Sequence, residues 1–131
     1  MKKLLKENLL QFLEYYHYLH DSYITNIHYD IYNSKIEMLT NIVWSGTPIL
    51  KKDNTYQTNN VKMKIVFNDI EKCTIKEFLP WDYINEVNID YVIIDNKEYI
   101  CFKTVEVEPL VNIVCSSIEY KEFKEENNQN E

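Results

Sequence analysis

The sequence predicts an α+β domain in which one N-terminal amphipathic helix packs on an antiparallel β-meander of about seven strands. Apolar residues recur at helical spacing near the N-terminus, apolar and polar residues alternate over most of the remainder, and short stretches rich in Asn and Asp separate the alternating segments. The 131 residues, 45% of them hydrophobic, are enough for one core. We expect a single domain over residues 1–120 and a charged, flexible tail over residues 121–131.

The helix is predicted within residues 2–19, where apolar side chains follow a 4-3-4-3 spacing that places them on one face. This stripe consists of Leu5, Leu9, Phe12, Tyr16 and Leu19, widened by Leu13. Lysines near the start of the segment oppose the helix dipole, and no capping residue precedes them. Packing of the stripe against the sheet must therefore supply most of the stability of the helix.

The strands are predicted where the period of the apolar residues changes to two. The expected strands cover residues 27–31, 36–38, 61–67, 73–75, 87–93, 100–104 and 111–120. Short turns are expected at Asn33-Ser34, Asn68-Asp69 and Asp95-Asn96, because Asn and Asp tolerate turn conformations. Residues 44–60, which combine a glycine and a proline with a polar string, are predicted to form a long mobile loop.

Composition bears on the compartment and on the class of partner. The net charge is −7 and the chain has no arginine, so no basic track for nucleic acid is expected. The three cysteines are widely spaced within apolar runs, so they are predicted to be small core residues without disulfides. No signal peptide and no apolar run of membrane-spanning length is visible, and the bias toward Ile, Asn and Lys is typical of AT-rich bacterial genomes. We expect a cytoplasmic bacterial protein without membrane contact.

No catalytic motif, metal site or cofactor site is predicted. His20, Asp21 and Ser22 include the three residue types of a hydrolase triad, but adjacent residues point in different directions and cannot align as one. The simpler interpretation is that Asp21 and Ser22 end the helix and cap the turn into the first strand. A ligand-binding role for the three residues is the alternative.

The aromatic residues give the main positive indication of function. Eleven tyrosines and two tryptophans exceed what a small core requires, and such side chains are frequent anchors of protein interfaces. Together with nearby carboxylates they predict an acidic and aromatic patch for a basic protein partner. The candidate partner-binding residues are Trp44, Tyr56, Trp81, Asp82, Tyr83 and Glu86. Aromatic caps over the open ends of the sheet are the structural alternative.

A family resemblance points in the same direction. Residues 16–24 (YHYLHDSYI), followed by alternating segments and by residues 65–70 (IVFNDI), resemble a pattern in small bacterial immunity-like proteins of polymorphic-toxin systems. The resemblance covers residues 12–75 and implies a helix, a helix-to-strand junction and then a β-meander. It also implies a protein that neutralises a toxin, but it identifies neither the toxin nor any functional residue.

Three functions therefore compete. The first is a non-catalytic protein-binding module of the immunity type, which requires exposed aromatic residues among carboxylates. The second is a small-ligand binder or enzyme with a pocket in the curved sheet, where His20, His28 or a tyrosine supplies the polar group. The third is a structural domain that forms homo-oligomers through a self-complementary apolar surface.

Overall fold

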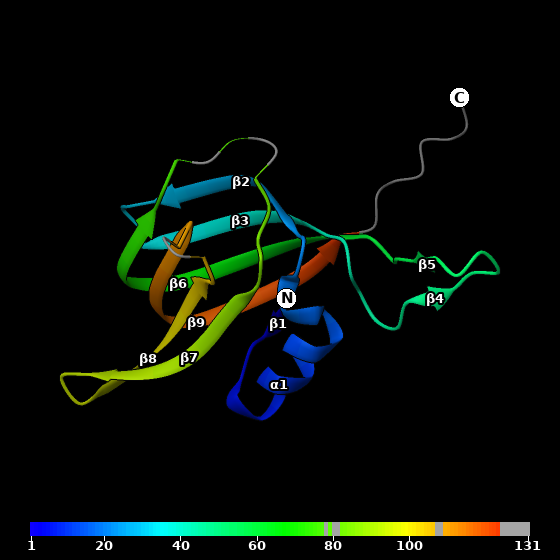
Figure 1. Ribbon diagram of the computed structural model, residues 1–131. Helices are drawn as coiled ribbons and strands as arrows, with labels where there is room; N and C mark the ends of the chain where they lie inside the picture. The colour runs from blue at the N-terminus through cyan, green and yellow to red at the C-terminus, as the bar shows by residue number, and fades with distance from the viewer. Residues whose placement is uncertain (78, 80–81, 107–108, 124–131) are drawn as a thin grey trace.

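The structure is a computed structural model that describes residues 1–77, 79, 82–106 and 109–123 (Figure 1). Its helical elements are α1 (Lys6–Tyr15) and a single 3-10 turn, η1 (His17–Leu19). Its strands are β1 (Lys2–Lys3), β2 (Tyr23–Asp30), β3 (Lys35–Ile42), β4 (Ile49–Leu50), β5 (Tyr56–Gln57), β6 (Val61–Ile75), β7 (Val87–Ile94), β8 (Lys97–Thr104) and β9 (Val111–Phe123). The predicted α+β class is confirmed, with one α-helix and mostly antiparallel sheet among the described residues.

The predicted simple meander is wrong. The main sheet is open, with the strand order β2-β3-β6-β9-β8-β7, and β1 adds to β9. The chain builds β2, β3 and β6, crosses to the far edge at β7, and returns through β8 to β9, which pairs with β6. Two three-stranded units are thus joined through their last and longest strands. Alternation identifies strands and tight hairpins, but it carries no information about this long-range pairing.

The predicted turn at Asn68-Asp69 is also replaced by continuous strand. β6 runs through this position and pairs with β9 on both sides of it, with a register shift between Ile70 and Lys72. Asp69 adopts a φ of 53°, a conformation that Asp tolerates better than most residues. The Asn-Asp signal therefore lies just before the irregularity in β6, where the extra residue is Glu71, and it does not end the strand.

The helix is shorter than the predicted segment. Residues Lys2–Lys3 form β1 on β9, and α1 begins only at Lys6. The side chain of Asn8 supplies an unpredicted cap, since its Oδ1 accepts a hydrogen bond of 2.7 Å from the backbone N–H of Leu5. The ring of Phe12 contacts Tyr120 of β9 at a centroid distance of 4.6 Å, so the apolar face of α1 packs on the sheet as expected.

The core lies on the face of the sheet that α1 covers. Met63, Ile65 and Phe67 alternate along β6 with residues on the opposite face, and all three are buried. Phe67 meets Phe102 of β8 edge to face at 5.1 Å, which links the two halves of the sheet. The opposite face carries polar pairs such as Lys64 with Glu37, whose charged atoms lie 3.5 Å apart.

Residues 44–60 contain an element that the sequence did not predict. Within the expected loop, β4 and β5 pair as a separate two-stranded sheet, which projects away from the main sheet (Figure 1). We call residues 48–59 the arm. At the other end of the chain, β9 runs to Phe123, and the rest of the predicted tail lies outside the described residues. Over the described part of the chain, no helix is both long and apolar enough to span a membrane.

Candidate functional site

The junction between α1 and β2 has an unusual backbone conformation. His17, Tyr18 and Leu19 have φ angles of 50°, 55° and 56°, so three successive non-glycine residues occupy the left-handed region. Each such residue costs about 1–2 kcal/mol relative to the right-handed conformation. Leu19 is completely buried, and its apolar contacts offset part of this cost. The turn changes the direction of the chain sharply between the helix and the sheet.

The sequence-predicted residues His20 and Asp21 are tied to neighbouring segments at this junction. The indole N–H of Trp44 donates to Asp21 Oδ2 over 3.2 Å, and His20 Nε2 lies 3.3 Å from the same oxygen. His20 Nδ1 lies 2.7 Å from the carbonyl oxygen of Asn85. Both ring nitrogens of His20 are therefore engaged within the protein. These contacts fix the orientation of the ring at the junction.

Ser22, the third residue of this set, is part of the core. Its residue surface is fully buried, and its backbone carbonyl accepts a hydrogen bond of 2.7 Å from the N–H of Ile84. Ile84 in turn accepts from the N–H of Asp21 over 2.9 Å. The hydroxyl of Ser22 has no hydrogen-bond partner among the described residues. It is out of reach of any substrate, so the geometry supports the junction role and not a triad.

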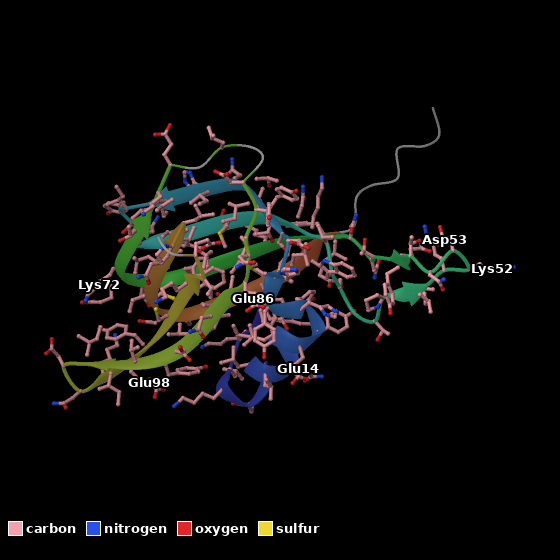
Figure 2. The ribbon with its side chains drawn as sticks, viewed as in Figure 1. Glu14, Lys52, Asp53, Lys72, Glu86 and Glu98 are labelled. Atoms are coloured by element: carbon pink, nitrogen blue, oxygen red, sulfur yellow. The ribbon has the colours of Figure 1, made fainter. Side chains whose placement is uncertain are left out.

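The candidate partner-binding residues lie in three separate places. Trp44 is half-buried against the ring of His17, while Tyr56 is exposed on the arm. Asp82, Tyr83 and Glu86 lie in the connector that leads to β7, and Trp81 is outside the described residues. Figure 2 shows Glu86 beside the body of the molecule, far from the tip of the arm where Asp53 lies.

The connector residues are occupied mainly with local structure. Asp82 Oδ2 accepts a hydrogen bond of 2.6 Å from the N–H of Leu79, and Tyr83 contacts Tyr23 of β2 edge to face at 6.3 Å. The carbonyl oxygen of Glu86 accepts from the N–H of Val105 over 2.8 Å, which extends the pairing of β7 with β8. The Tyr83–Tyr23 contact places the connector against β2, at the opposite end of the strand order from β7.

A concave surface that the sequence did not predict lies between α1 and the arm. We call it the arm groove. It has a volume of about 1150 Å³, and the helix contributes Glu7, Leu10 and Glu14 to its lining. The arm contributes apolar and amide side chains, among them Pro48 and Ile49. Sequence reasoning missed the groove because the arm was expected to be an unstructured loop.

The arm groove is acidic. Glu7 and Glu14 lie two helical turns apart on one face of α1, about 10 Å along the axis. Among the described residues neither glutamate forms an ion pair, and no lysine lines the groove. Leu10 is 60% exposed between them, and Ile49 is 62% exposed across the groove. Uncompensated carboxylates therefore flank apolar surface that water covers in the isolated chain.

The root of the arm is fixed to the end of the helix. The N–H of Gly46 donates to the carbonyl oxygen of Tyr15 over 2.8 Å, and His17 Nε2 lies 2.7 Å from the carbonyl oxygen of Gly46. Gly46 has a φ of 67°, and a Cβ at this position would meet the hydroxyl oxygen of Tyr15 at 3.5 Å. That contact is an ordinary one, so the left-handed backbone is what favours glycine here. The groove is therefore present before any ligand binds.

A second concavity, of about 840 Å³, lies between α1 and β9. Its walls include the rings of Phe12, Tyr16 and Tyr120, and the hydroxyl of Tyr16 donates to Glu122 Oε1 over 2.6 Å. Burial, reinforced by the negative charge of Glu122, raises the pKa of Tyr16 well above 10.0. The phenol therefore stays protonated and acts as a hydrogen-bond donor, not as a base.

Neither metal chemistry nor similarity supplies a function. Within the described ranges, no group of three or more His, Cys, Asp or Glu side chains is arranged to hold a metal ion. The chain matches no protein-family model, and comparison with curated proteins gives no significant match. The function must therefore be argued from the two concave surfaces and their charges.

Proposed function

We propose that this protein is a non-catalytic binding module that holds a basic segment of a protein partner in the arm groove. The observation that carries this proposal is the pair of uncompensated carboxylates, Glu7 and Glu14, beside exposed Leu10. A segment with lysine or arginine side chains on either side of an apolar residue complements this arrangement in charge and in polarity.

Ion pairs and apolar contacts contribute differently to the free energy of binding. A solvent-exposed ion pair contributes about 0–1 kcal/mol, so two such pairs at Glu7 and Glu14 do not by themselves give a stable complex. Burial of the apolar surface around Leu10 and Ile49 supplies the additional free energy, at roughly 25 cal/mol per Å². The carboxylates select the partner, and the net charge of −7 accelerates encounter with a basic one.

Neutralisation of a toxin is the biological role that suits this chemistry. The active site of a nuclease toxin is basic because it must bind phosphate, and an acidic binder attracts and covers such a site. The resemblance of residues 16–24 to immunity-like proteins supports the same role. We therefore place the protein in the bacterial cytoplasm, where an immunity protein protects its own cell.

A peptide titration tests the groove. The probes are a short fluorescein-labelled peptide of lysines and leucines and its counterpart with glutamate in place of lysine. We expect the lysine peptide alone to bind, and the double variant Glu7→Gln/Glu14→Gln to weaken it by roughly fivefold to tenfold in fluorescence anisotropy. The control variant Glu71→Gln/Asp95→Asn changes the net charge equally at exposed sites elsewhere and should leave the affinity within about twofold.

Either of two results would reject the groove. Equal loss of affinity in the two double variants would show that only net charge matters, and equal binding of both peptides would show that charge does not select. The partner itself is sought by affinity pull-down from the source organism at low and at high salt. A basic protein that is retained by the wild type and lost from Glu7→Gln/Glu14→Gln would be the expected result.

A small planar ligand in the concavity beside β9 is the second candidate function. The aromatic walls favour an apolar ring, and the Tyr16 hydroxyl, whose proton is donated to Glu122, can accept a hydrogen bond from a donor on the ligand. A screen of aromatic fragments by two-dimensional NMR tests this. Shifts confined to α1 and to the end of β9 would support it, and their persistence in Tyr16→Phe/Tyr120→Leu would exclude this concavity.

A further inference from the structure

We propose that two copies of this chain bind each other by exchanging arms, each arm lying in the arm groove of the other copy. The occupant is a second copy of the chain, and the contact is reciprocal. This inference goes beyond the proposed function, because it concerns what fills the groove when no partner is present. A basic partner would then compete with the arm of the second copy.

The apolar surface of the arm supports an interface. Ile49, Leu50 and Tyr56 are each about 60% exposed, although they form most of its two short strands. β4 and β5 pair only with each other, and an isolated two-stranded hairpin is marginally stable in water. In a single copy these apolar side chains therefore lack the cover that would stabilise the arm.

The charges of the arm complement those of the groove. Lys51 and Lys52 lie at the tip, and among the described residues neither forms an ion pair. The neighbouring carboxylate of Asp53 keeps its charge and accepts hydrogen bonds from the N–H and the hydroxyl of Thr55 over 3.0 and 2.6 Å, so the tip has two positive charges and one negative. The chain thus carries two unpaired ammonium groups on the arm and two unpaired carboxylates, Glu7 and Glu14, in the groove.

The lysines of the arm cannot reach the carboxylates of the arm groove within one copy. Figure 2 shows Lys52 at the far end of the arm, whereas Glu14 lies on α1 near its root. The hydrogen bond between Gly46 and Tyr15 fixes that root, so the tip points away from the helix. The arm of a second copy is not constrained in this way and can reach the groove. Under a two-fold axis each copy provides one arm and one groove, so both contacts form at once and the assembly closes as a dimer.

The net negative charge of each chain opposes dimerisation, so the ionic strength of the measurement matters. Two chains of net charge −7 repel each other at long range, whereas the arm contact is local. At physiological ionic strength the Debye length is about 8 Å, so the long-range repulsion is screened more strongly than the direct contacts. The dimer is therefore best measured near that ionic strength and not in salt-free buffer.

Light scattering with a charge exchange tests the proposal. Wild-type protein should shift with concentration from 15.9 kDa toward twice that mass. The variants Lys51→Glu/Lys52→Glu and Glu7→Lys/Glu14→Lys should each remain monomeric, because each opposes like charges in both contacts. An equimolar mixture of the two should dimerise again, because acidic tips then meet basic grooves and basic tips meet acidic grooves.

A charge-reversal variant elsewhere on the surface and a folding measurement serve as controls. Lys72→Glu/Lys103→Glu reverses two exposed lysines elsewhere on the sheet and should dimerise only slightly less than wild type, and circular dichroism confirms that each variant folds. Wild type that stays monomeric up to about 1 mM overturns the proposal, as does a mixture that stays monomeric. Monomeric protein that still binds the lysine peptide keeps the proposed function and rejects arm exchange alone. In a dimer the exchanged arm competes with the peptide, so the proposed function is then tested in monomeric Lys51→Glu/Lys52→Glu, whose groove residues are unchanged. Failure of that variant to bind the peptide would reject the proposed function and keep arm exchange.

Discussion

The thiol of Cys115 shows how burial in the core changes the pKa of one ionisable side chain. It lies on β9 with no exposed surface, and its Sγ is 3.8 Å from the carbonyl oxygen of Ile100. Burial raises the pKa of its thiol from 9.0 to about 12, because the interior disfavours the thiolate. The sequence predicted all three cysteines to be core residues. Cys115 fits that prediction fully, whereas Cys73 and Cys101 are only partly buried.

Alkaline pH should therefore destabilise the protein through Cys115. Below pH 9 the thiol is protonated in both the folded and the unfolded chain, and its burial carries no penalty from ionisation. Above pH 9 only the unfolded chain loses the proton, so the free energy of unfolding falls until about pH 12. Near pH 11, two units above the pKa of the unfolded chain, this loss is about 3 kcal/mol. Urea denaturation at pH 8 and pH 11 should show a smaller fall in Cys115→Ala than in wild type. An equal fall would mean that the thiol does not contribute.

At the scale of the element, the junction η1 departs most from what local propensity favours. Its left-handed residues lie between a right-handed helix and a strand, and the junction is held by Leu19 in the core and by the links of Asp21 to Trp44 and to Ile84. Backbone strain of this kind persists only where surrounding contacts determine the conformation. As a result, His17 lies beside the arm groove. His20, three residues later, contacts the carbonyl oxygen of Asn85 in the connector.

Glycine at the centre of η1 should relieve part of this strain. Tyr18 has a φ of 55° and is about one-third exposed, so its replacement changes both the backbone preference and the packing of a partly buried ring. Comparison of Tyr18→Gly with Tyr18→Ala isolates the backbone effect, because both variants lose the same ring. We expect Tyr18→Gly to have the higher free energy of unfolding in urea, by about 1 kcal/mol. At Tyr32, which is 95% exposed and has no positive φ, Ala should be at least as stable as Gly. Equal stability of Tyr18→Gly and Tyr18→Ala would show that η1 is not strained.

At the scale of the whole molecule, stability and binding are located in different parts. The long strands and α1 contain the core, whereas the arm is a separate two-stranded sheet attached between β3 and β6. Ile42 and Val61 already pair where these two strands leave the main sheet. The fold therefore does not require the outer part of the arm, which is available for contacts with other molecules.

Shortening the arm should leave the fold nearly unchanged. Replacement of residues 50–56 by Asn-Gly keeps Ile49 and Gln57 as a pair and closes the hairpin with a tight turn. We expect the free energy of unfolding in urea to change by less than about 1 kcal/mol, because loop length has a weak effect on stability. Phe67→Ala, which removes a ring packed on Phe102, should cost about 3–5 kcal/mol and serves as the comparison. A loss of that size in the shortened arm would make the arm part of the core.

Local patterns in the sequence determined much of the fold. The stripe with Phe12 and Leu13 faces the core as predicted, and so do Met63, Ile65 and Phe67, because helical and strand periodicities report which face is buried. The turn at Asp95-Asn96 is confirmed as well. Both residues have positive φ between the paired Ile94 and Lys97, as a two-residue hairpin loop requires.

Only the tertiary structure decided how these elements are combined. The pairing of β6 with β9, the left-handed turn at His17 and the arm beside α1 depend on contacts between residues far apart in the sequence. In the sequence alone, Glu7 and Glu14 have the pattern of an ordinary solvated helix face. They become a candidate binding site only because the hydrogen bond of Gly46 to Tyr15 holds the arm across from them. No periodicity along the chain encodes that contact.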